Sequence, residues 1–343
     1  MFDLEKITRK NVRLMKAYSS ARDEFKGQAD IWLDANENPN ESNLNRYPDP
    51  LQLSLKKKIA EKKKLPAEQI FVGNGSDEAI DLLFRAFCEP GQSKAILFPP
   101  TYGMYEVSAA INNIEVAEIP LTNKFEIPQL DVIKPFLNCT GLLFICSPNN
   151  PTGNCTSSEA IKEIAKNFDG LVIVDEAYVD FSNAESATAL IETTPNLVVL
   201  QTFSKAYGLA GARVGMAFAN AEIISVLNKI KPPYNMNTLS ISAASEALEN
   251  QSVINSQIQT IQSERERMKA ELFELNNVVQ VYPSEANFLL TEFTDSEKVF
   301  SALLNEGIVV RNRNSAIKNC LRISLGTPTE NNQLITTLNK LQS

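Results

Sequence analysis

The sequence predicts an α/β fold, with a large domain built on a mostly parallel seven-stranded sheet covered by helices and a smaller α+β domain. Three observations predict it. The 343 residues are enough for a large core and for two domains. Five continuous apolar runs, typical of parallel strands buried on both faces, recur at the spacing of α/β units. Helical patterns separate several of these runs, and a further group of strands and helices follows a long helical stretch near the C-terminus.

The composition excludes several classes of protein. It is 43% hydrophobic and 22% charged, which is ordinary for a globular protein, and its net charge of -8 disfavours nucleic-acid binding, which needs a basic face. No run of eighteen apolar residues predicts a membrane span, and the N-terminus lacks the apolar stretch of a signal peptide. Five scattered cysteines without a Cys-x-x-Cys pair suggest reduced thiols, so we expect a cytoplasmic protein.

The chain contains no histidine. This absence removes the Ser-His-Asp and Cys-His nucleophile systems and the commonest zinc and iron sites. We therefore expect no metal site. Any acid-base chemistry has to come from lysine, aspartate, glutamate, tyrosine or cysteine side chains.

Residues 1–40 show weak periodicity and predict an N-terminal arm that packs on another part of the molecule, with the C-terminal domain as one candidate. The large domain is expected over 41–250 and begins with a Lys-rich helix over 51–64. A strand over 70–72 then leads into the loop Gly73-Asn74-Gly75-Ser76-Asp77, and a helix with an apolar face begins at its end. A loop that enters a helix N-terminus suits a phosphate. A plain turn with Ser76 or Asp77 as the N-cap explains the same residues.

Four further apolar runs are expected to be strands over 95–98, 142–145, 171–174 and 198–200, with another strand over 216–219. Each of the four is followed by a polar or glycine-rich segment. Ligands bind at the carboxyl edge of an open α/β sheet. Six residues that follow strands should therefore converge on one crevice: Gly75, Tyr102, Asn150, Asp175, Tyr178 and Lys205.

The C-terminal part begins with helices expected over 221–231 and about 240–275, of which the second leads into a small domain over 251–343. There we expect a helix over 298–306, strands over 308–311 and 321–325, and a final helix opened by a capping box from Thr327 to Glu330. Arg311 and Arg322 lie on the two strands. They suit either salt bridges at a sheet edge or an anion clamp.

Lys205 follows a buried strand and is flanked by hydroxyl residues, so its amine is a candidate for a Schiff base with a carbonyl. A surface lysine or a phosphate clamp is the alternative. If the carbonyl belongs to pyridoxal phosphate, released Lys205 is the general base. The ring nitrogen then needs a carboxylate, which Asp175 can supply, and the ring face needs an apolar plate, which Tyr102 can supply. The bland alternative for Asp175 is an exposed acid at a strand end.

The remaining parts of that cofactor also find partners in the sequence. Tyr178 and Asn150 are placed to donate to the ring oxygen, although turn formation and packing explain them equally. The phosphate needs backbone N–H groups, hydroxyls and a cation. Its expected partners are Gly75, Ser76, Asp77, Ser204 and Arg213.

These motifs resemble the fold-type I aminotransferases. The segments that carry the resemblance are Ser147 to Gly153, Asp175 to Tyr178 and Ser204 to Arg213. Within that group the chain resembles the histidinol-phosphate aminotransferase family, of the class II subgroup. The additional matching segments are 18–22, 33–39, 46–50, 75–78, 85–91, 99–105 and 320–323. The resemblance covers nearly the whole chain.

The resemblance implies a homodimer with active sites at the interface, in which Tyr47 of each subunit reaches the cofactor phosphate of the other. It implies that Tyr18, Asn150, Arg311 and Arg322 contact the substrate and that the arginines hold its phosphate or the glutamate carboxylate. Arg313 is a rival for the role of Arg311. We accordingly expect transamination between L-histidinol phosphate and 2-oxoglutarate in histidine biosynthesis. The alternatives are an aromatic amino-acid aminotransferase, a pyridoxal-phosphate-dependent decarboxylase of a phosphorylated amino acid, and a non-catalytic regulator of the same fold.

Overall fold

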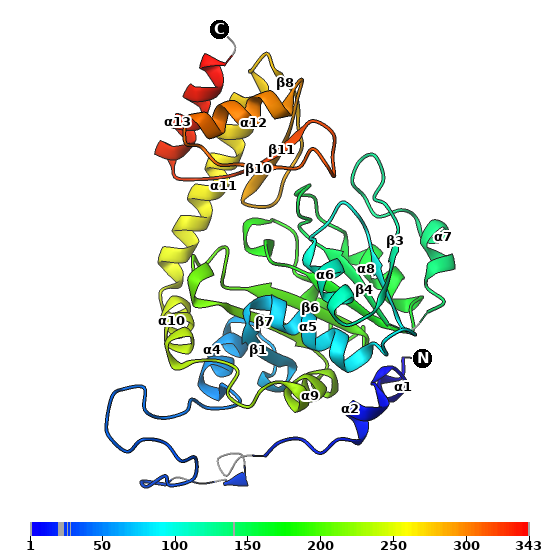
Figure 1. The fold of residues 1–343 in the computed structure, drawn as a ribbon, viewed down its shortest axis with the longest axis vertical. Coiled ribbons are helices and arrows are strands. Elements are labelled where there is room, and N and C mark those ends of the chain that lie inside the picture. The colour runs from blue at the N-terminus through cyan, green and yellow to red at the C-terminus, as the bar shows by residue number, and fades with distance from the viewer. Residues whose placement is uncertain (1, 20–23, 26, 28, 140, 342–343) are drawn as a thin grey trace.

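The computed structural model describes residues 2–19, 24–25, 27, 29–139 and 141–341. It contains a seven-stranded sheet covered by helices and a separate four-stranded sheet beside it (Figure 1). The predicted fold class is therefore confirmed. No helix in the described part of the chain is long and apolar enough to cross a membrane. The domain boundaries at residues 40 and 250 stay predictions.

The large sheet has the strand order β1-β7-β6-β5-β4-β2-β3. Its strands are β1 Ile70–Asn74, β2 Lys94–Leu97, β3 Glu115–Glu118, β4 Gly141–Cys146, β5 Leu171–Asp175, β6 Leu197–Thr202 and β7 Val214–Ala219. Only β7 runs antiparallel to its neighbours, so the sheet is mostly parallel, as predicted. The central strands β4, β5 and β6 are buried along their whole length, which explains their continuous apolar sequence. The edge strand β3 was not predicted, because exposed glutamates at both ends interrupt its short apolar pattern.

Helices cover both faces of this sheet. The helices of this part are α4 Leu53–Lys63, α5 Gly75–Phe87, α6 Met104–Ile111, α7 Leu130–Ile133, α8 Ser158–Lys166, α9 Ala221–Ile230 and α10 Thr238–Glu249. Side chains of α5, α6 and α9 join one hydrophobic cluster with alternate strand residues, and side chains of α4, α8 and α10 join the other. Short 3-10 helices occur at Ala67–Gln69, Lys134–Phe136, Val179–Phe181, Ala187–Leu190 and Ala210–Ala212.

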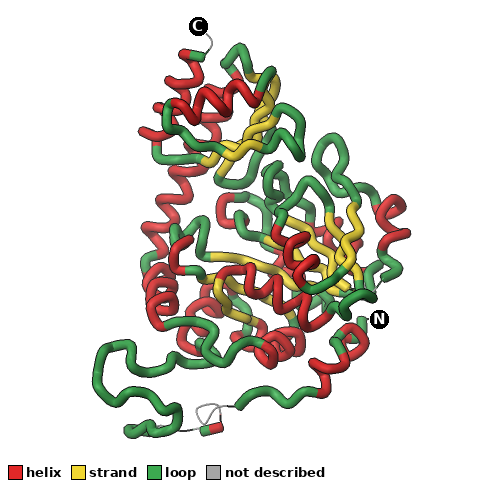
Figure 2. The backbone as a smooth tube through the Cα atoms, in the orientation of Figure 1, coloured by secondary structure: helices red, strands yellow, loops and turns green. Residues whose placement is uncertain are grey.

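The N-terminal segment has two short helices, α1 Leu4–Ile7 and α2 Lys10–Leu14, that lie beside the large sheet. Residues 15–19 and 29–52 run as extended loops away from the body of the molecule, and the second loop returns to it at α4 (Figure 2). Large apolar side chains on this loop are exposed, including Leu33 at 90% and Tyr18 at 69%. Residues 20–22 of the motif at 18–22 lie outside the described residues.

The smaller sheet is antiparallel throughout, with the order β10-β11-β9-β8. Its strands are β8 Val278–Val281, β9 Phe288–Phe293, β10 Arg311–Asn312 and β11 Cys320–Ser324, and its helices are α12 Ser296–Asn305 and α13 Pro328–Lys340. The capping box of Thr327 and Glu330 is confirmed. The strand expected over 308–311 was too long, since only Arg311 of that range is paired. Strands β8 and β9 were not predicted.

The single helix expected over about 240–275 is wrong. The chain forms α10 and then α11, Gln251–Phe273, with a break at Asn250. The Asn250 backbone leaves the helical conformation and its side-chain amide donates to the Glu246 carbonyl oxygen at 3.1 Å. Asparagine competes with helical hydrogen bonding in this way, and α11 can therefore leave the large domain in its own direction.

Candidate active site

One cleft opens at the carboxyl edge of the large sheet. It is lined by Gly75, Ser76, Asp77, Tyr102, Cys146, Asn150, Asp175, Ala177, Tyr178, Thr202, Ser204, Lys205, Ala210 and Arg213. These residues come from the ends of β1, β4, β5 and β6 and from the segments that follow these strands and β2. The predicted convergence of the strand-end motifs is thus observed, while the chemical roles of the individual residues stay predictions.

Lys205 lies in the turn that follows β6. Its Nζ atom lies 5.5 Å from the centre of the Tyr178 ring. The side chain is exposed to the open cleft, but the cleft walls remove part of its hydration. This desolvation, together with the positive charge of Arg322, lowers the pKa of Lys205 below its ordinary value. A lowered pKa increases the fraction of Lys205 that carries the neutral, nucleophilic amine.

Asp175 is the last residue of β5 and is only 2% exposed. Its Oδ2 atom accepts a hydrogen bond of 2.7 Å from the Tyr105 hydroxyl, and its Oδ1 atom accepts one of 3.1 Å from the Ala177 amide. Burial raises the pKa of Asp175, and these hydrogen bonds oppose that effect. A cation beside a buried carboxylate of this kind stabilises its charged form. A protonated ring nitrogen would be such a cation.

Tyr105 was not among the predicted site residues. It is fully buried, stacks on Phe144 at 4.5 Å and meets the edge of Tyr102 at 5.4 Å. The sequence contained one hint, because Tyr105, at the start of α6, follows Tyr102 by three residues. Its hydrogen bond to Asp175, seventy residues away, could not be read from that spacing.

The predicted phosphate site lies where α5 begins against β7. Gly75 has a φ of +73°, and a Cβ atom there would lie 2.6 Å from Nη2 of Arg213. A Cβ atom on Gly215 would lie 2.1 Å from the Ser76 amide nitrogen. The positive φ of Gly75 favours glycine at that position, and the absence of a Cβ atom at Gly215 lets β7 approach the backbone of the first turn of α5. The N–H groups of that turn have no intrahelical partners and suit an anion.

The N-cap of α5 is Asn74, without a side-chain cap, so the alternative in which Ser76 or Asp77 is the N-cap is wrong. The Asp77 carboxylate instead accepts hydrogen bonds of 3.3 Å from both Arg213 and Tyr102. Ser204 lies close by, with its hydroxyl accepting from Thr202 at 3.0 Å. Hydroxyl, cation and helix N-terminus thus surround one end of the cleft, as a phosphate group requires.

Arginines of the small domain border the other end of the cleft. Nη1 of Arg322 donates to Oδ1 of Asn150 at 2.5 Å, and Nδ2 of Asn150 donates to the Tyr178 hydroxyl at 3.3 Å. Arg311 lies directly opposite Arg322 in the β10–β11 pair, and Arg313 follows two residues later. Desolvation and the neighbouring arginines lower the pKa of Arg313.

Within the described residues, none of these three arginines forms an ion pair, and the buried Nε atoms of Arg313 and Arg322 lack a hydrogen-bond acceptor. Among the residues that the structure describes, the structural salt bridge considered for Arg311 and Arg322 is not formed. Like charges opposite each other on a strand pair are unfavourable unless an anion joins them. The arrangement fits an acidic ligand.

Two predicted site residues lie outside the cleft. Tyr18 is on the arm, and Tyr47 stacks on Tyr234 at 4.4 Å beside a separate pocket between the arm and the start of α10. The expectation that Tyr47 serves the site of a second subunit stays a prediction.

The chain is similar to known proteins in sequence. The family described as aminotransferase class I and II matches residues 21–338. A histidinol-phosphate aminotransferase from Cytophaga hutchinsonii is 48% identical, over 98% of this chain and 99% of that protein. The corresponding protein from Flavobacterium johnsoniae is 49% identical over 99% of each chain.

Solved structures are similar as well. The histidinol-phosphate aminotransferase from Clostridium acetobutylicum has a TM-score of 0.81 and 26% identity, over 88% of this chain and 91% of that one. The enzyme from Sinorhizobium meliloti, solved in complex with pyridoxal-5'-phosphate, has a TM-score of 0.79 over 87% of this chain and 84% of that one. At 23% identity the second structure supports the fold alone.

Proposed function

The chain belongs to the aminotransferase class I and II family, and on that premise we propose that it transfers an amino group between L-histidinol phosphate and 2-oxoglutarate. The products are imidazole acetol phosphate and L-glutamate, in the biosynthesis of L-histidine. The proposal is supported by relatives of that name that are 48% and 49% identical over nearly the whole chain.

The proposed cofactor is pyridoxal phosphate, which fits the cleft at each of its ends. When bound, it withdraws electrons from the carbon that carries the substrate amine, so that a proton can leave that carbon. Asp175 supplies a buried carboxylate for the ring nitrogen, and the Tyr102 ring supplies a face for stacking. The first turn of α5, Ser204 and Arg213 supply donors for the phosphate.

Lys205 has two tasks in this proposal. With pyridoxal phosphate bound, its Nζ atom would hold the aldehyde carbon, and once the substrate amine had displaced it the same Nζ atom would accept and return the proton. The lowered pKa of Lys205 favours both tasks, because both require the neutral amine. Tyr178 and Asn150, joined by a hydrogen bond of 3.3 Å, line the same cleft and would donate to the ring oxygen.

The observation that carries the choice of substrate is the group of Arg311, Arg313 and Arg322 at the cleft end, without a carboxylate among the described residues to neutralise it. Planar guanidinium groups bind phosphates and carboxylates through paired hydrogen bonds, so one site can accept both substrates in turn. An aromatic amino acid has no anionic group on its side chain, so it would leave the positive charge of these arginines without a partner.

A kinetic comparison of L-histidinol phosphate, L-phenylalanine and L-phosphoserine as amino donors to 2-oxoglutarate tests the proposal. We expect kcat/KM for L-histidinol phosphate to exceed that for L-phenylalanine by at least roughly tenfold, since a charged hydrogen bond contributes about 1.5–3 kcal/mol. Equal or better use of L-phenylalanine would overturn the substrate assignment. Release of carbon dioxide from L-phosphoserine in place of keto-acid formation would identify a decarboxylase.

The proposal includes a homodimer. Support comes from the exposed apolar side chains of the arm and of the nearby start of α10, such as Leu33 at 90% and Leu239 at 65%, which a second copy would cover. Sedimentation equilibrium should give twice the 38.0 kDa mass of one chain, and a monomer at micromolar concentration would contradict it. We also propose a reducing compartment, the cytoplasm, because all five cysteines are free thiols.

A further inference from the structure

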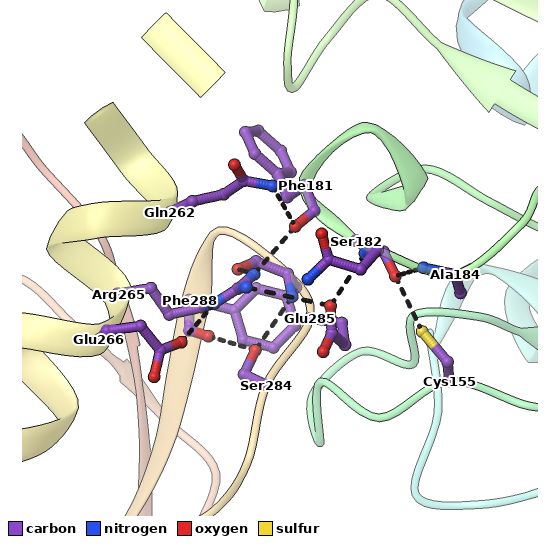
Figure 3. A network of polar contacts seen from close by, with 12 residues as sticks. Cys155, Phe181, Ser182, Ala184, Gln262, Arg265, Glu266, Ser284, Glu285 and Phe288 are labelled. Atoms are coloured by element: carbon purple, nitrogen blue, oxygen red, sulfur yellow. Dashed lines mark hydrogen bonds and ion pairs between the residues drawn. The ribbon is translucent and has the colours of Figure 1, made fainter. Parts of the chain in front are cut away.

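Arg265 is a buried cation that the proposed chemistry does not use. It lies in the middle of α11, and its side chain is 6% exposed. Its Nη1 atom donates to the carbonyl oxygen of Phe181 at 3.1 Å and to that of Ala286 at 3.2 Å (Figure 3). Phe181 follows β5 of the large domain, whereas Ala286 lies in the turn between β8 and β9. One guanidinium therefore ties α11 to a loop of each domain.

Other contacts strengthen the same junction. Nε2 of Gln262 also donates to the Phe181 carbonyl oxygen, at 3.1 Å. The Glu285 amide donates to the Gly153 carbonyl oxygen at 2.7 Å, and the Glu285 carboxylate lies 3.9 Å from Nη2 of Arg265. A Cβ atom on Gly153 would lie 2.4 Å from Oγ of Ser284, so the turn is packed closely against the large domain. The junction is polar, buried and directional, and it fixes one relative position of the two parts.

The same turn continues into the cleft. The Ser284 hydroxyl donates to the Phe288 carbonyl oxygen at 2.7 Å. The Phe288 ring meets the Tyr178 ring edge-on, with centres 5.1 Å apart. The Arg322 guanidinium lies over the Phe288 ring, 5.3 Å from its centre. The position of the turn thus determines where Phe288 and Arg322 lie against the cleft wall.

We propose that Arg265 is a positioning residue for substrate binding. By holding the turn over residues 282–288 on the large domain, it sets the position of Arg322 relative to Asn150 and so the affinity for the acidic group of the substrate. This inference rests on the proposed role of Arg322 as a substrate ligand. Loss of the guanidinium removes one donor from two buried carbonyl groups and leaves Ala286 without its side-chain partner.

The test is Arg265→Gln in the full-length enzyme with its cofactor. KM for L-histidinol phosphate should rise roughly 10- to 100-fold, the effect of a displacement of about 1 Å at a binding group. KM for L-histidinol, which lacks the phosphate, should change less than about threefold, because no charged contact is lost. Cofactor affinity and the absorption spectrum should stay unchanged, since the residues assigned to the cofactor lie outside the small domain.

Arg267→Gln is the matched control. Arg267 is two residues further along α11, but it forms ion pairs at the surface with Glu264 and Glu271 and is 31% exposed. It should behave like the wild type. Hydrogen exchange of the 282–288 peptide should accelerate in Arg265→Gln and not in Arg267→Gln. If Arg265→Gln fails to fold, Gly153→Ala disturbs the same junction from the large domain and should give the same selective rise in KM.

A double-mutant cycle with Arg322→Ala separates positioning from general destabilisation. If Arg265 acts through Arg322, Arg265→Gln should add less than about threefold to KM in the Arg322→Ala background. An equal effect in both backgrounds, or an equal rise in KM for both donors, overturns the inference. If Arg322→Ala alone leaves KM for L-histidinol phosphate unchanged, the proposed function of Arg322 fails first, and this coupling fails with it.

Discussion

Tyr105→Phe isolates the hydrogen bond that supports Asp175. The substitution removes one hydroxyl and keeps the ring that stacks on Phe144. A hydrogen bond to a charged group contributes about 1.5–3 kcal/mol and one between neutral groups about 0.5–1.5 kcal/mol. The difference, roughly 1–1.5 kcal/mol, is what the Tyr105 hydroxyl contributes specifically to the ionised carboxylate. Because the hydroxyl favours the ionised carboxylate, its loss should raise the pKa of Asp175 further.

The sign of the effect follows from linkage. Burial raises the folded-state pKa of Asp175 above the ordinary 3.8, so stability is lost as the pH rises from that value through the folded pKa. The loss continues to a higher pH in Tyr105→Phe, because its folded pKa is higher. The difference in unfolding free energy between wild type and variant should therefore grow with pH, from about 1 to about 2 kcal/mol. Urea denaturation of the cofactor-free protein across a pH series measures it.

Tyr282→Phe is the control, since the Tyr282 hydroxyl also donates to a carboxylate, Glu292, at 3.0 Å but in the small domain. It should leave cofactor affinity unchanged, whereas Tyr105→Phe should weaken it by up to about tenfold, the equivalent of about 1.4 kcal/mol. A stability difference for Tyr105→Phe that does not vary with pH would refute the reasoning.

Three further predictions concern the cleft. Borohydride reduction of the enzyme with its cofactor should fix pyridoxal phosphate on the peptide that contains Lys205, as mass spectrometry can show, and labelling of another lysine would exclude the assignment. Asp175→Asn should keep the fold, judged by circular dichroism, and lower kcat by about 10²- to 10³-fold, the typical loss of a stabilising electrostatic group; wild-type turnover would contradict the role. Arg213→Gln should raise the dissociation constant for the cofactor by roughly 10- to 100-fold through loss of a charged hydrogen bond, measured by fluorescence titration, and an unchanged constant would place the phosphate elsewhere.

The cleft could be predicted from the sequence because its position follows from strand direction. Runs buried on both faces, such as 142–145 and 171–174, had to be parallel strands, and their carboxyl ends share one edge. Asp175 and Lys205 were therefore brought together without any knowledge of side-chain contacts. The capping box at Thr327 was equally local, since all of its hydrogen bonds join residues within one turn.

Contacts between distant segments could not be predicted. The Tyr105 hydroxyl meets Asp175 only because α6 packs on the face of the sheet where β5 ends, and no local pattern encodes that partner. Arg265 sits within a charged stretch of sequence that is typical of a solvated helix face, yet its side chain is buried between two domains. The break at Asn250 was hidden, because the apolar periodicity continues across it.

The two glycines at the phosphate end also constrain how the protein can change over generations. Gly75 and Gly215 are separated by most of the large domain in sequence, but they lie close together at the start of α5. Gly75 leaves room for Arg213, and Gly215 leaves room for Ser76. A side chain at position 215 would push the helix away from β7, and no single compensating change at Ser76 could help, because the obstructed atom belongs to the backbone. We therefore expect Gly215 to stay unchanged during evolution while residues on the exposed helix faces around it are substituted. Selection for folded protein from a library randomised at position 215 should yield glycine.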